Sequence, residues 1–396
     1  MKNVSSSLSR VIPGLSLFMA LILLLSACGG SGNSGAVRSG TPGGGGGSGS
    51  ITPTLSVTPA IQLGPQPCPA SVKDAAHWDA IIPTQPNVTQ VGRVICGYLA
   101  GKPTLQALVN VYHAGTGQVL DIYVYDNITA PGPTQLFKLT GLYKGDARIS
   151  NYNTIVTAEV DQDSSVNKGK PNAALIPDLF REFNTGTFAR VSFPGIYPDL
   201  TRYQAEHDQA QVNQGQDAWK LDATQVATHF AGNSQLLNWT NTTPTLVSGG
   251  GSNDAGAVVR VKVKDSSPAG AGVTLTMQRL EGNTNGGIWE IVAVNSEGMS
   301  ITSPKNRDAL ISPVTVSGTG NAFEGVIGPV MVLDHTYTSI GHATAMGTGN
   351  GPTTFSVNVP FTPTFKNGAE DGIVVLYATN NANGSYAAAM MLKELL

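Results

Sequence analysis

The 396-residue sequence has little charge and almost no cysteine. Asp, Glu, Lys and Arg make up 12% of the chain, about half of the roughly 25% that soluble domains usually contain. The formal net charge is −3, so the composition excludes the basic footprint of a nucleic-acid-binding protein. Apolar residues make up 41%, which excludes wholesale disorder. The 47 glycines and 24 prolines therefore indicate folded, loop-rich β modules.

The first 27 residues have the pattern of a lipoprotein signal peptide. A sparse positive region precedes the apolar run 15–25, and Leu25-Ser26-Ala27 leads directly to Cys28. Small residues mark a cleavage point, and a cysteine placed there predicts attachment of lipid, with fatty acyl chains such as palmitate. A membrane-spanning helix needs roughly 20 apolar residues, about twice this run. We therefore expect removal of 1–27 and a lipid anchor at Cys28 on the extracytoplasmic face of the cell membrane.

The other two cysteines, Cys68 and Cys96, form an even pair in an exported chain. Such a pair predicts a disulfide. The loop that it would close, about 29 residues, corresponds to a stabilisation of roughly 3–4 kcal/mol. Two free thiols or a metal site are the alternatives, and these need a reducing compartment or further ligands.

Four segments follow the signal peptide. The stretch 28–66 is rich in Gly, Ser, Thr and Pro, and it has too few apolar residues to offset its ordering entropy, so we expect a disordered linker. Alternating apolar and polar runs between turn residues then predict a multi-domain, mainly β chain. The expected domains are a disulfide-tied β domain (67–198), an α+β roll (199–300) and a β sandwich (301–396).

The roll region contains the clearest helix signals. An apolar stripe over 200–210 predicts one helix. Asp222 is placed as the N-cap of a second helix, Gln225 follows three residues later, and Gly232 ends it. Alternating strands come next, so the region looks like a cystatin roll, as an analogy of fold only. Within the preceding β domain, 174–183 predicts one further short helix.

The last region reads as a β sandwich. About seven short strands with turns between them fill 301–396. Phe355, Val357 and Val359 alternate with polar residues and predict one inward face. The region has no cysteine and no tryptophan, which excludes the disulfide and the packed Trp of antibody domains. A sandwich of about 100 residues is long enough to be expected to fold alone.

Several short elements of this last region carry a family resemblance. In chain order they are Ser303-Pro304, Ile311 to Gly318, Ala322 to Gly325, Val332 to Asp334, Phe355 to Phe361, Gly372 to Val375 and Asn383 to Ser385. They resemble the immunoglobulin-like domain of bacterial spore-germination proteins. The resemblance covers about the last quarter of the chain, and it implies an immunoglobulin-like sandwich on an envelope protein without established catalysis.

No standard catalytic pattern is present: the sequence has no G-x-S-x-G elbow, no H-E-x-x-H and no Walker loop. Glu206 and His207 lie on the first expected helix of the roll, a fold that can hold a pocket between helix and sheet. Because His207 shares the apolar stripe, a packed histidine is the favoured interpretation. An enzyme with a pocket around Glu206 and His207 is the alternative. The tryptophans of the roll are expected in its core rather than on a carbohydrate-stacking platform: Trp219, Trp239 and Trp289.

Two polar stretches bear on metal binding. The sequence from Asp161 begins like a calcium loop, but Val166 stands where the motif needs Gly and Asn172 where it needs Glu, which favours a solvated turn. Asp334-His335 and His342 have no third spaced ligand, which favours surface residues. We therefore expect no metal site, no catalytic residues and no cofactor.

These patterns predict a non-catalytic lipoprotein of the cell envelope that acts in binding or scaffolding at the cell surface. The expected partners are the membrane, through the lipid, and a cell-wall polymer or an envelope protein, with no nucleic acid. The resemblance adds a link to sporulation or germination. A solute-binding lipoprotein is a third class, but its duplicated α/β lobes are not visible.

Overall fold

The computed structural model describes residues 61–184, 186–263, 272–282, 285–365, 370–380 and 383–396. The signal peptide, Cys28 and all but the last six residues of the expected linker lie outside these ranges. The chain divides into two units, Met1–Val57 and Thr58–Leu396, and every element below belongs to the second. Within the described ranges, no helix is long and apolar enough to cross a membrane.

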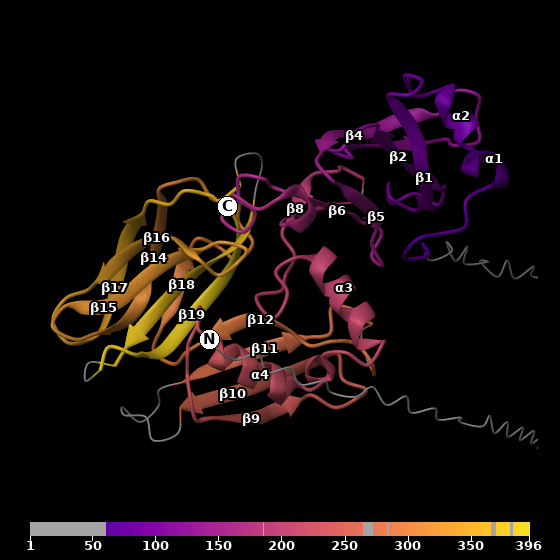
Figure 1. Ribbon diagram of the computed structural model, residues 1–396. Helices are drawn as coiled ribbons and strands as arrows, with labels where there is room; N and C mark the ends of the chain where they lie inside the picture. Colours follow the sequence, from indigo (N-terminus) through magenta and orange to yellow (C-terminus); the bar gives the residue numbers. More distant parts are fainter. Residues whose placement is uncertain (1–60, 185, 264–271, 283–284, 366–369, 381–382) are drawn as a thin grey trace, which may run out of the picture. The chain divides into compact units, whose positions relative to one another are not determined.

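The first region is built on a four-stranded antiparallel sheet with the order β1-β2-β3-β4 (Figure 1). Helices α1 and α2 pack on one face through Val72 and Trp78. On the other face, Ile122 packs with Ile155 of a second sheet. Because both faces are covered, β2 and β3 are buried almost throughout. The bounds are α1 Ala70–Lys73, α2 Ala75–Asp79, β1 Thr89–Gly97, β2 Gln106–His113, β3 Leu120–Asp126 and β4 Thr134–Leu142.

The second sheet of this region has the order β5-β6-β7-β8. Its strands are β5 Asp146–Ile149, β6 Ile155–Glu159, β7 Leu179–Phe183 and β8 Arg190–Val191. The helix predicted over 174–183 is wrong: a 3-10 turn, η1 (Asn172–Ala174), leads to β7. A short apolar run fits a helix or a strand equally well by pattern. The run forms a strand because it pairs with β6, from Leu179 opposite Glu159 to Phe183 opposite Ile155.

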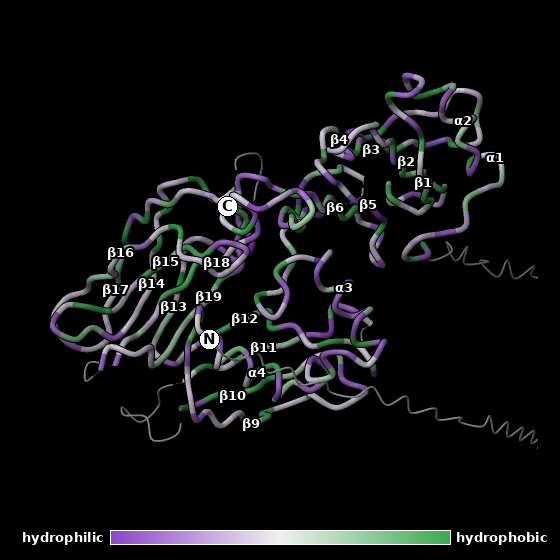
Figure 2. The backbone as a smooth tube through the Cα atoms, in the orientation of Figure 1, coloured by the Kyte–Doolittle hydropathy of each residue, from purple (hydrophilic) through white to green (hydrophobic). Residues whose placement is uncertain are grey.

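Two helices and four antiparallel strands follow, in the predicted order. The Asp222 side chain accepts hydrogen bonds from the backbone N–H groups of Thr224 (2.8 Å) and Gln225 (3.2 Å), and α4 ends at Gly232. Helix α3 consists mostly of hydrophilic residues, purple in Figure 2, whereas α4 buries Phe230 in the core of the sheet. The bounds are α3 Arg202–Val212, η2 Ala218–Leu221, α4 Ala223–Gly232, β9 Thr242–Gly249, β10 Gly256–Val263, β11 Val273–Gln278 and β12 Glu290–Asn295.

The last region is a sandwich of antiparallel strands. One sheet has the order β13-β14-β17, and the facing strands are β16, β15, β18 and β19. Val316 and Phe355 of the first sheet share a core with Val332 and Leu376 of the second. The mainly β class and the immunoglobulin-like sandwich are confirmed. The bounds are β13 Ser300–Ser303, β14 Val314–Ala322, β15 Val326–Leu333, β16 Ser339–Met346, β17 Gly351–Val359, β18 Asp371–Thr379 and β19 Tyr386–Leu395.

One sheet runs through both the roll and the sandwich. Its order is β16-β15-β18-β19-β12-β11-β10-β9, and β12 meets β19 where Val294 lies opposite Met391. Successive residues of β18 face two different cores. Val374 and Leu376 point into the sandwich. The alternate residues belong to the core that contains α4: Ile373, Val375 and Tyr377.

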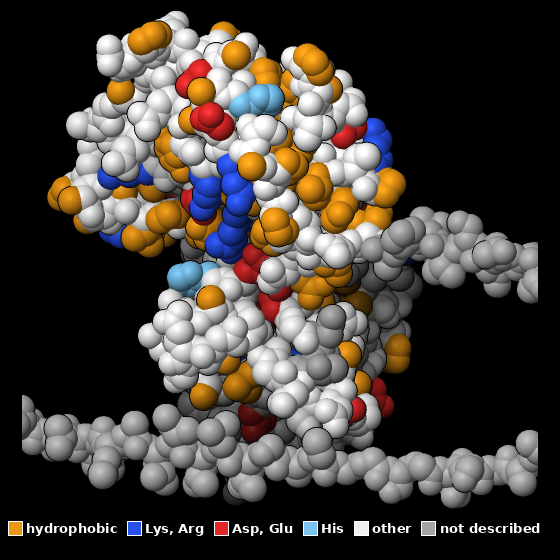
Figure 3. All heavy atoms as spheres, turned by 90° about the vertical axis from the view of Figure 1, so that its right-hand side faces the viewer, with side chains coloured by type: hydrophobic (Ala, Val, Ile, Leu, Met, Phe, Trp, Pro, Cys, Tyr) orange, Lys and Arg blue, Asp and Glu red, His pale blue; other side chains and the backbone are white. Residues whose placement is uncertain are grey.

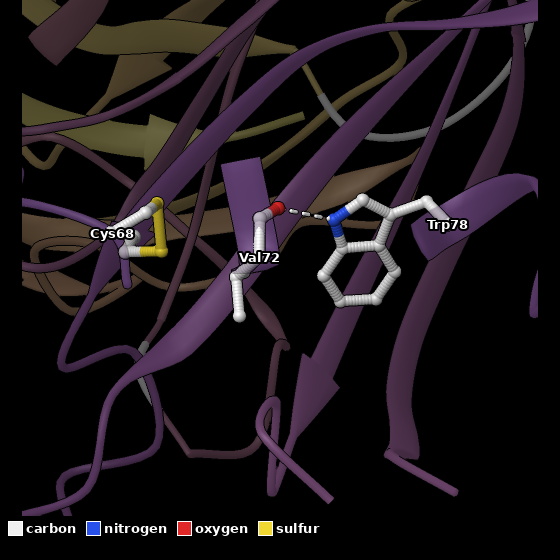
Figure 4. The surroundings of a disulfide bond; sticks show 4 residues. Cys68, Val72 and Trp78 are labelled. Carbon is white, nitrogen blue, oxygen red and sulfur yellow. Dashed lines mark hydrogen bonds between the residues drawn. A yellow bond between two sulfur atoms is a disulfide. The ribbon is translucent and has the colours of Figure 1, made fainter. Parts of the chain in front are cut away.

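A disulfide joins Cys68 to Cys96 and so ties the segment before α1 to the end of β1 (Figure 4). Beside it, the indole N–H of Trp78 donates a hydrogen bond of 2.7 Å to the carbonyl oxygen of Val72. Cys96 and Trp78 are both fully buried. The bridge therefore fixes the α1–α2 cover on the first sheet.

Replacing both Cys68 and Cys96 by Ala is expected to lower the free energy of unfolding by roughly 3 kcal/mol, because the bridge restricts the unfolded chain. Urea unfolding of the double variant beside the parent measures this change. In the native parent, neither thiol should react with an alkylating reagent before reduction. Alkylation of both cysteines in the folded protein would contradict the bridge.

Candidate functional site

Helix α3 points the two residues of the predicted pocket in different directions. The Oε1 atom of Glu206 accepts a hydrogen bond of 2.7 Å from the backbone N–H of Asn151, and Oε2 lies 3.4 Å from Nε of Arg148. His207 is exposed, with its Nε2 2.9 Å from Nε2 of Gln211. Neighbouring helix residues project about 100° apart, so Glu206 and His207 do not converge. The interpretation of His207 as a packed residue is wrong.

Glu206 belongs to a group of five charged side chains, which we call the Arg202 cluster: Arg148, Glu182, Arg202, Glu206 and Glu281. Nε of Arg202 donates to Glu182 at 2.7 Å, and Nη1 donates to Glu281 at 2.9 Å. The Arg202 side chain is 11% exposed and Glu281 only 1%. The Arg202 guanidinium also lies 4.3 Å from the ring centroid of Tyr152. The cluster connects β5 and β7 to α3 and the segment after β11.

A hollow of about 400 Å³ lies beside the Arg202 cluster. Its lining consists of Tyr152, Arg202, Ala255, Gly256, Gln278, Arg279 and Leu280, so neither Glu206 nor His207 contributes. Burial raises the pKa of Glu281 to about 8; the Arg202 charge opposes this rise, and the smaller repulsion from Glu206 adds to it. A carboxyl group that stays protonated near neutral pH can serve as an acid where it reaches a ligand.

Two other carboxyl groups in the interior have raised pKa values. Burial raises the pKa of Glu394 to about 9, with added repulsion from Asp308. Burial and the charge of the adjacent Asp199 raise the pKa of Glu290 well above its usual range. Both glutamates are fully buried. Burial is therefore the main cause of the raised pKa values of these two interior carboxyl groups.

Glu281→Gln is expected to weaken the pH dependence of stability. The pKa of Glu281 is about 8 in the folded chain, against an ordinary value of 4.5. Because the pKa of Glu281 is raised in the folded chain, its protonated form contributes its full stabilisation of the fold below a pH of about 4.5. This contribution is lost as the pH rises through about 8. Between pH of about 5 and about 9, the parent should lose on the order of 4 kcal/mol more than the variant in urea unfolding. The exposed Glu297→Gln serves as control, and equal losses for Glu281→Gln and the parent would contradict the assignment.

A second hollow, of about 470 Å³, lies at the C-terminal end of α4, and we call it the α4 hollow. It is lined by Tyr197, Thr228, His229, Gly232, Asn233, Ser234 and Gln235. Beside it, the exposed ring of His229 stacks on Trp219, with centroids 4.1 Å apart and planes 19° apart. Trp239 and Trp289 are buried in the core as predicted, but Trp219 is only partly buried.

The polar pair Asp334-His335 is buried rather than on the surface, and Glu370 joins it. The three offer ligand-type atoms within 4.8 Å of one another. Nδ1 of His335 contacts Oε1 of Glu370, and Oε2 of Glu370 accepts from the backbone N–H of Thr364 at 2.9 Å. Burial opposes a charge on His335, but the hydrogen bond to Glu370 and its charge outweigh it and raise the pKa of His335.

Both carboxylates of this group already accept several hydrogen bonds. The Oδ1 atom of Asp334 accepts from the backbone N–H groups of Thr336 and Thr338, and Oδ2 accepts from the Thr364 hydroxyl. The group therefore connects the β15–β16 turn to the segment between β17 and β18; we call it the loop clamp. His342, on β16, is exposed and takes no part.

The stretch from Asp161 is held by its own hydrogen bonds. The Asn167 amide donates to the carbonyl oxygens of Asp161 (3.2 Å) and Ile176 (2.9 Å), and its oxygen accepts from the Ile176 N–H. Ser164 and Asn167 are each 1% exposed. The stretch is a turn with Gln162, Asp163 and Ser165 exposed, as predicted, but Ser164 and Asn167 lie inside the loop and bind its backbone.

The fold of the last region defines its class as an immunoglobulin-like β module, with one sheet shared with the roll. Residues 299–385 match the model of a family described as immunoglobulin-like domain of bacterial spore germination. This match confirms the resemblance seen in the sequence and fits a role related to spore germination. It covers less than a quarter of the chain. The chain matches no curated protein and no solved structure.

Proposed function

We propose that this protein is a non-catalytic lipoprotein of the cell envelope that binds or scaffolds at the cell surface in a process related to germination. The observation that carries the proposal is the family match of residues 299–385. The sheet shared by β12 and β19 supports it, because a module continuous with its neighbour can hold a binding surface in a fixed position. The proposed partner is a cell-wall polymer or another envelope protein.

The geometry around α3 also supports a binding role. Glu206 is engaged by Arg148 and by the Asn151 backbone, and a carboxylate held in this way is a poor general base. Charged side chains are sparse on the face drawn in Figure 3, where small groups of blue and red lie among uncharged atoms. A partner with many uncharged polar groups suits such a surface.

The enzyme alternative keeps one observation in its favour, the protonated Glu281 beside the hollow of about 400 Å³. An assay of the purified chain on insoluble cell wall would discriminate between an enzyme and a binding protein. Release of soluble fragments that is lost in Glu281→Gln supports the enzyme. Retention of the chain on the wall without release supports binding.

Cys28→Ala is expected to move the chain out of the membrane fraction and to leave an unprocessed precursor, because the cysteine precedes its proposed cleavage point and carries the lipid. Mass spectrometry of the N-terminal peptide and detergent partitioning measure the change. Cys68→Ala, which removes a different thiol, should keep the lipid. A Cys28→Ala chain that still carries a lipid-modified mass would overturn the anchor.

A further inference from the structure

The α4 hollow has the chemistry of a site for an uncharged, hydroxyl-rich ligand. No carboxylate, lysine or arginine is among its seven lining residues, so its lining gives little selection for an ion. Its volume, about 470 Å³, lies in the range of small-molecule sites, which are roughly 300–1,000 Å³. Ligand recognition here must therefore depend on hydrogen bonds and on ring contacts.

Three side chains on one turn offer hydrogen-bonding groups to the hollow. Asn233 Oδ1 accepts from the backbone N–H of Gln235 at 2.9 Å, which fixes the turn after α4. Over the part of the chain that is described, the Asn233 amide NH₂, the Ser234 hydroxyl and the Gln235 side-chain oxygen have no protein partner. The turn thus offers a donor (the Asn233 NH₂), a hydroxyl that can donate and accept (Ser234) and an acceptor (the Gln235 oxygen). Neighbouring substituents of a sugar ring offer hydrogen-bonding groups that complement these three.

A ring platform borders the same turn. The His229 ring stacks on Trp219 at 4.1 Å, and Trp219 itself packs against the core of the roll. This stack holds the exposed His229 ring in place, and Tyr197 lines the hollow as a second ring. Aromatic faces carry partial negative charge, and the C–H face of a pyranose packs well on them.

The turn is also tied to the sandwich. Nε2 of Gln235 donates a hydrogen bond of 2.9 Å to the carbonyl oxygen of Thr336, in the turn between β15 and β16. Thr336 in turn donates to the buried Asp334, a member of the loop clamp described above. The side chain that presents the free acceptor therefore has little freedom, which lowers the entropy cost of binding.

We propose that the α4 hollow binds an N-acetylated sugar of a wall glycan strand. The acetamide supplies a carbonyl oxygen for the Asn233 amide and an N–H for the Gln235 oxygen, while the ring packs on His229. This proposal rests on the envelope-binding role proposed above and specifies its ligand class.

Titration of the full chain, in detergent, with the N-acetylglucosamine tetramer tests the proposal by calorimetry. Saturable binding is expected. His229→Ala removes the platform, and Asn233→Asp keeps the acceptor that holds the turn but loses the NH₂ donor. Each should raise Kd at least tenfold, about 1.4 kcal/mol. The matched control His207→Ala, exposed on α3, should bind like the parent. The maltose-type tetramer, which lacks acetamide groups, should bind at least tenfold more weakly.

Absence of saturable binding to the N-acetylglucosamine tetramer, or equal Kd values for the parent, His229→Ala and Asn233→Asp, would overturn the site. Circular dichroism of each variant, compared with the parent, shows that the fold is kept. Co-sedimentation of the same chain with insoluble cell wall separates the two proposals. Wall binding without tetramer binding leaves the envelope role standing and removes this site, whereas failure of both removes the envelope role as well.

Discussion

Lys393→Met is expected to lower the free energy of unfolding by about 3–5 kcal/mol, because it leaves a buried carboxylate without its cation. Lys393 is 0% exposed, and its Nζ lies 3.2 Å from Oδ1 of Asp371. The same ammonium donates to the carbonyl oxygen of Leu200, ahead of α3. Asp371 also accepts from the Ser192 hydroxyl at 3.1 Å. The Lys393–Asp371 pair thus connects the sandwich to Leu200 of the roll and to Ser192, which follows β8.

A second substitution distinguishes loss of charge balance from loss of packing. In Lys393→Met with Asp371→Leu, no uncompensated charge remains, so most of the lost stability should return. Lys305→Met, at an exposed lysine of the same region, should change stability by no more than about 0.5 kcal/mol. Urea unfolding of the four proteins gives the comparison. A single Lys393→Met variant as stable as the parent would show that Asp371 does not need the ammonium.

The isolated segment 299–396 is expected not to fold as a cooperative monomer, contrary to what its length and strand count suggest. Three side chains of β18 are at most 1% exposed in the whole chain and lie in the core that contains α4: Ile373, Val375 and Tyr377. Met391 of β19, also buried there, lies opposite Val294 of β12. Removing the roll exposes all of them, and exposed apolar surface of this kind promotes aggregation.

Substitutions on β18 make this prediction specific. Ile373→Thr with Val375→Thr should improve the solubility and monomer fraction of the segment, because the exposed face becomes polar. In the longer chain 58–396 the same pair should cost several kcal/mol, since it places hydroxyl groups in a core. Size-exclusion chromatography and thermal unfolding measure the two effects. A monomeric 299–396 segment with a sharp transition would show that the sandwich does not depend on the roll.

Local signals in the sequence predicted local structure well. The Asp222 cap and the Gly232 stop of α4 could be predicted because both act within one helical turn. Phe355 and Val359 alternate inward as expected, because a strand with one covered face repeats every two residues. The run that became β7 could not be assigned in this way, since its state depends on pairing with β6, which is set by the tertiary fold.

The candidate sites show the same difference between local signals, which the sequence reveals, and contacts that depend on the tertiary fold. Cys68 and Cys96 could be paired by elimination in the sequence. Arg202 and Glu281 are 79 residues apart, and no motif connects them, so their contact is visible only in the fold. His207 was placed on a stripe whose other members are apolar, but the helix presents it to solvent. The α4 hollow was not predicted: Trp219, which stacks beside it, was expected in the core, and the turn that completes the hollow contains ordinary polar residues.

The protonated interior glutamates make the folded chain more nearly neutral than its composition indicates. The formal charge of −3 counts every carboxyl group as ionised. Without Lys2 and Arg10 of the proposed signal peptide, the formal charge is −5 (21 basic against 26 acidic residues). Glu281 and Glu394, with pKa values of about 8 and about 9, keep their protons at neutral pH, which brings the charge of the tethered chain to about −3. Long-range repulsion from an anionic envelope is correspondingly reduced, and salt screens the remainder. A tethered chain of this kind approaches such a surface with two fewer negative charges than its composition indicates.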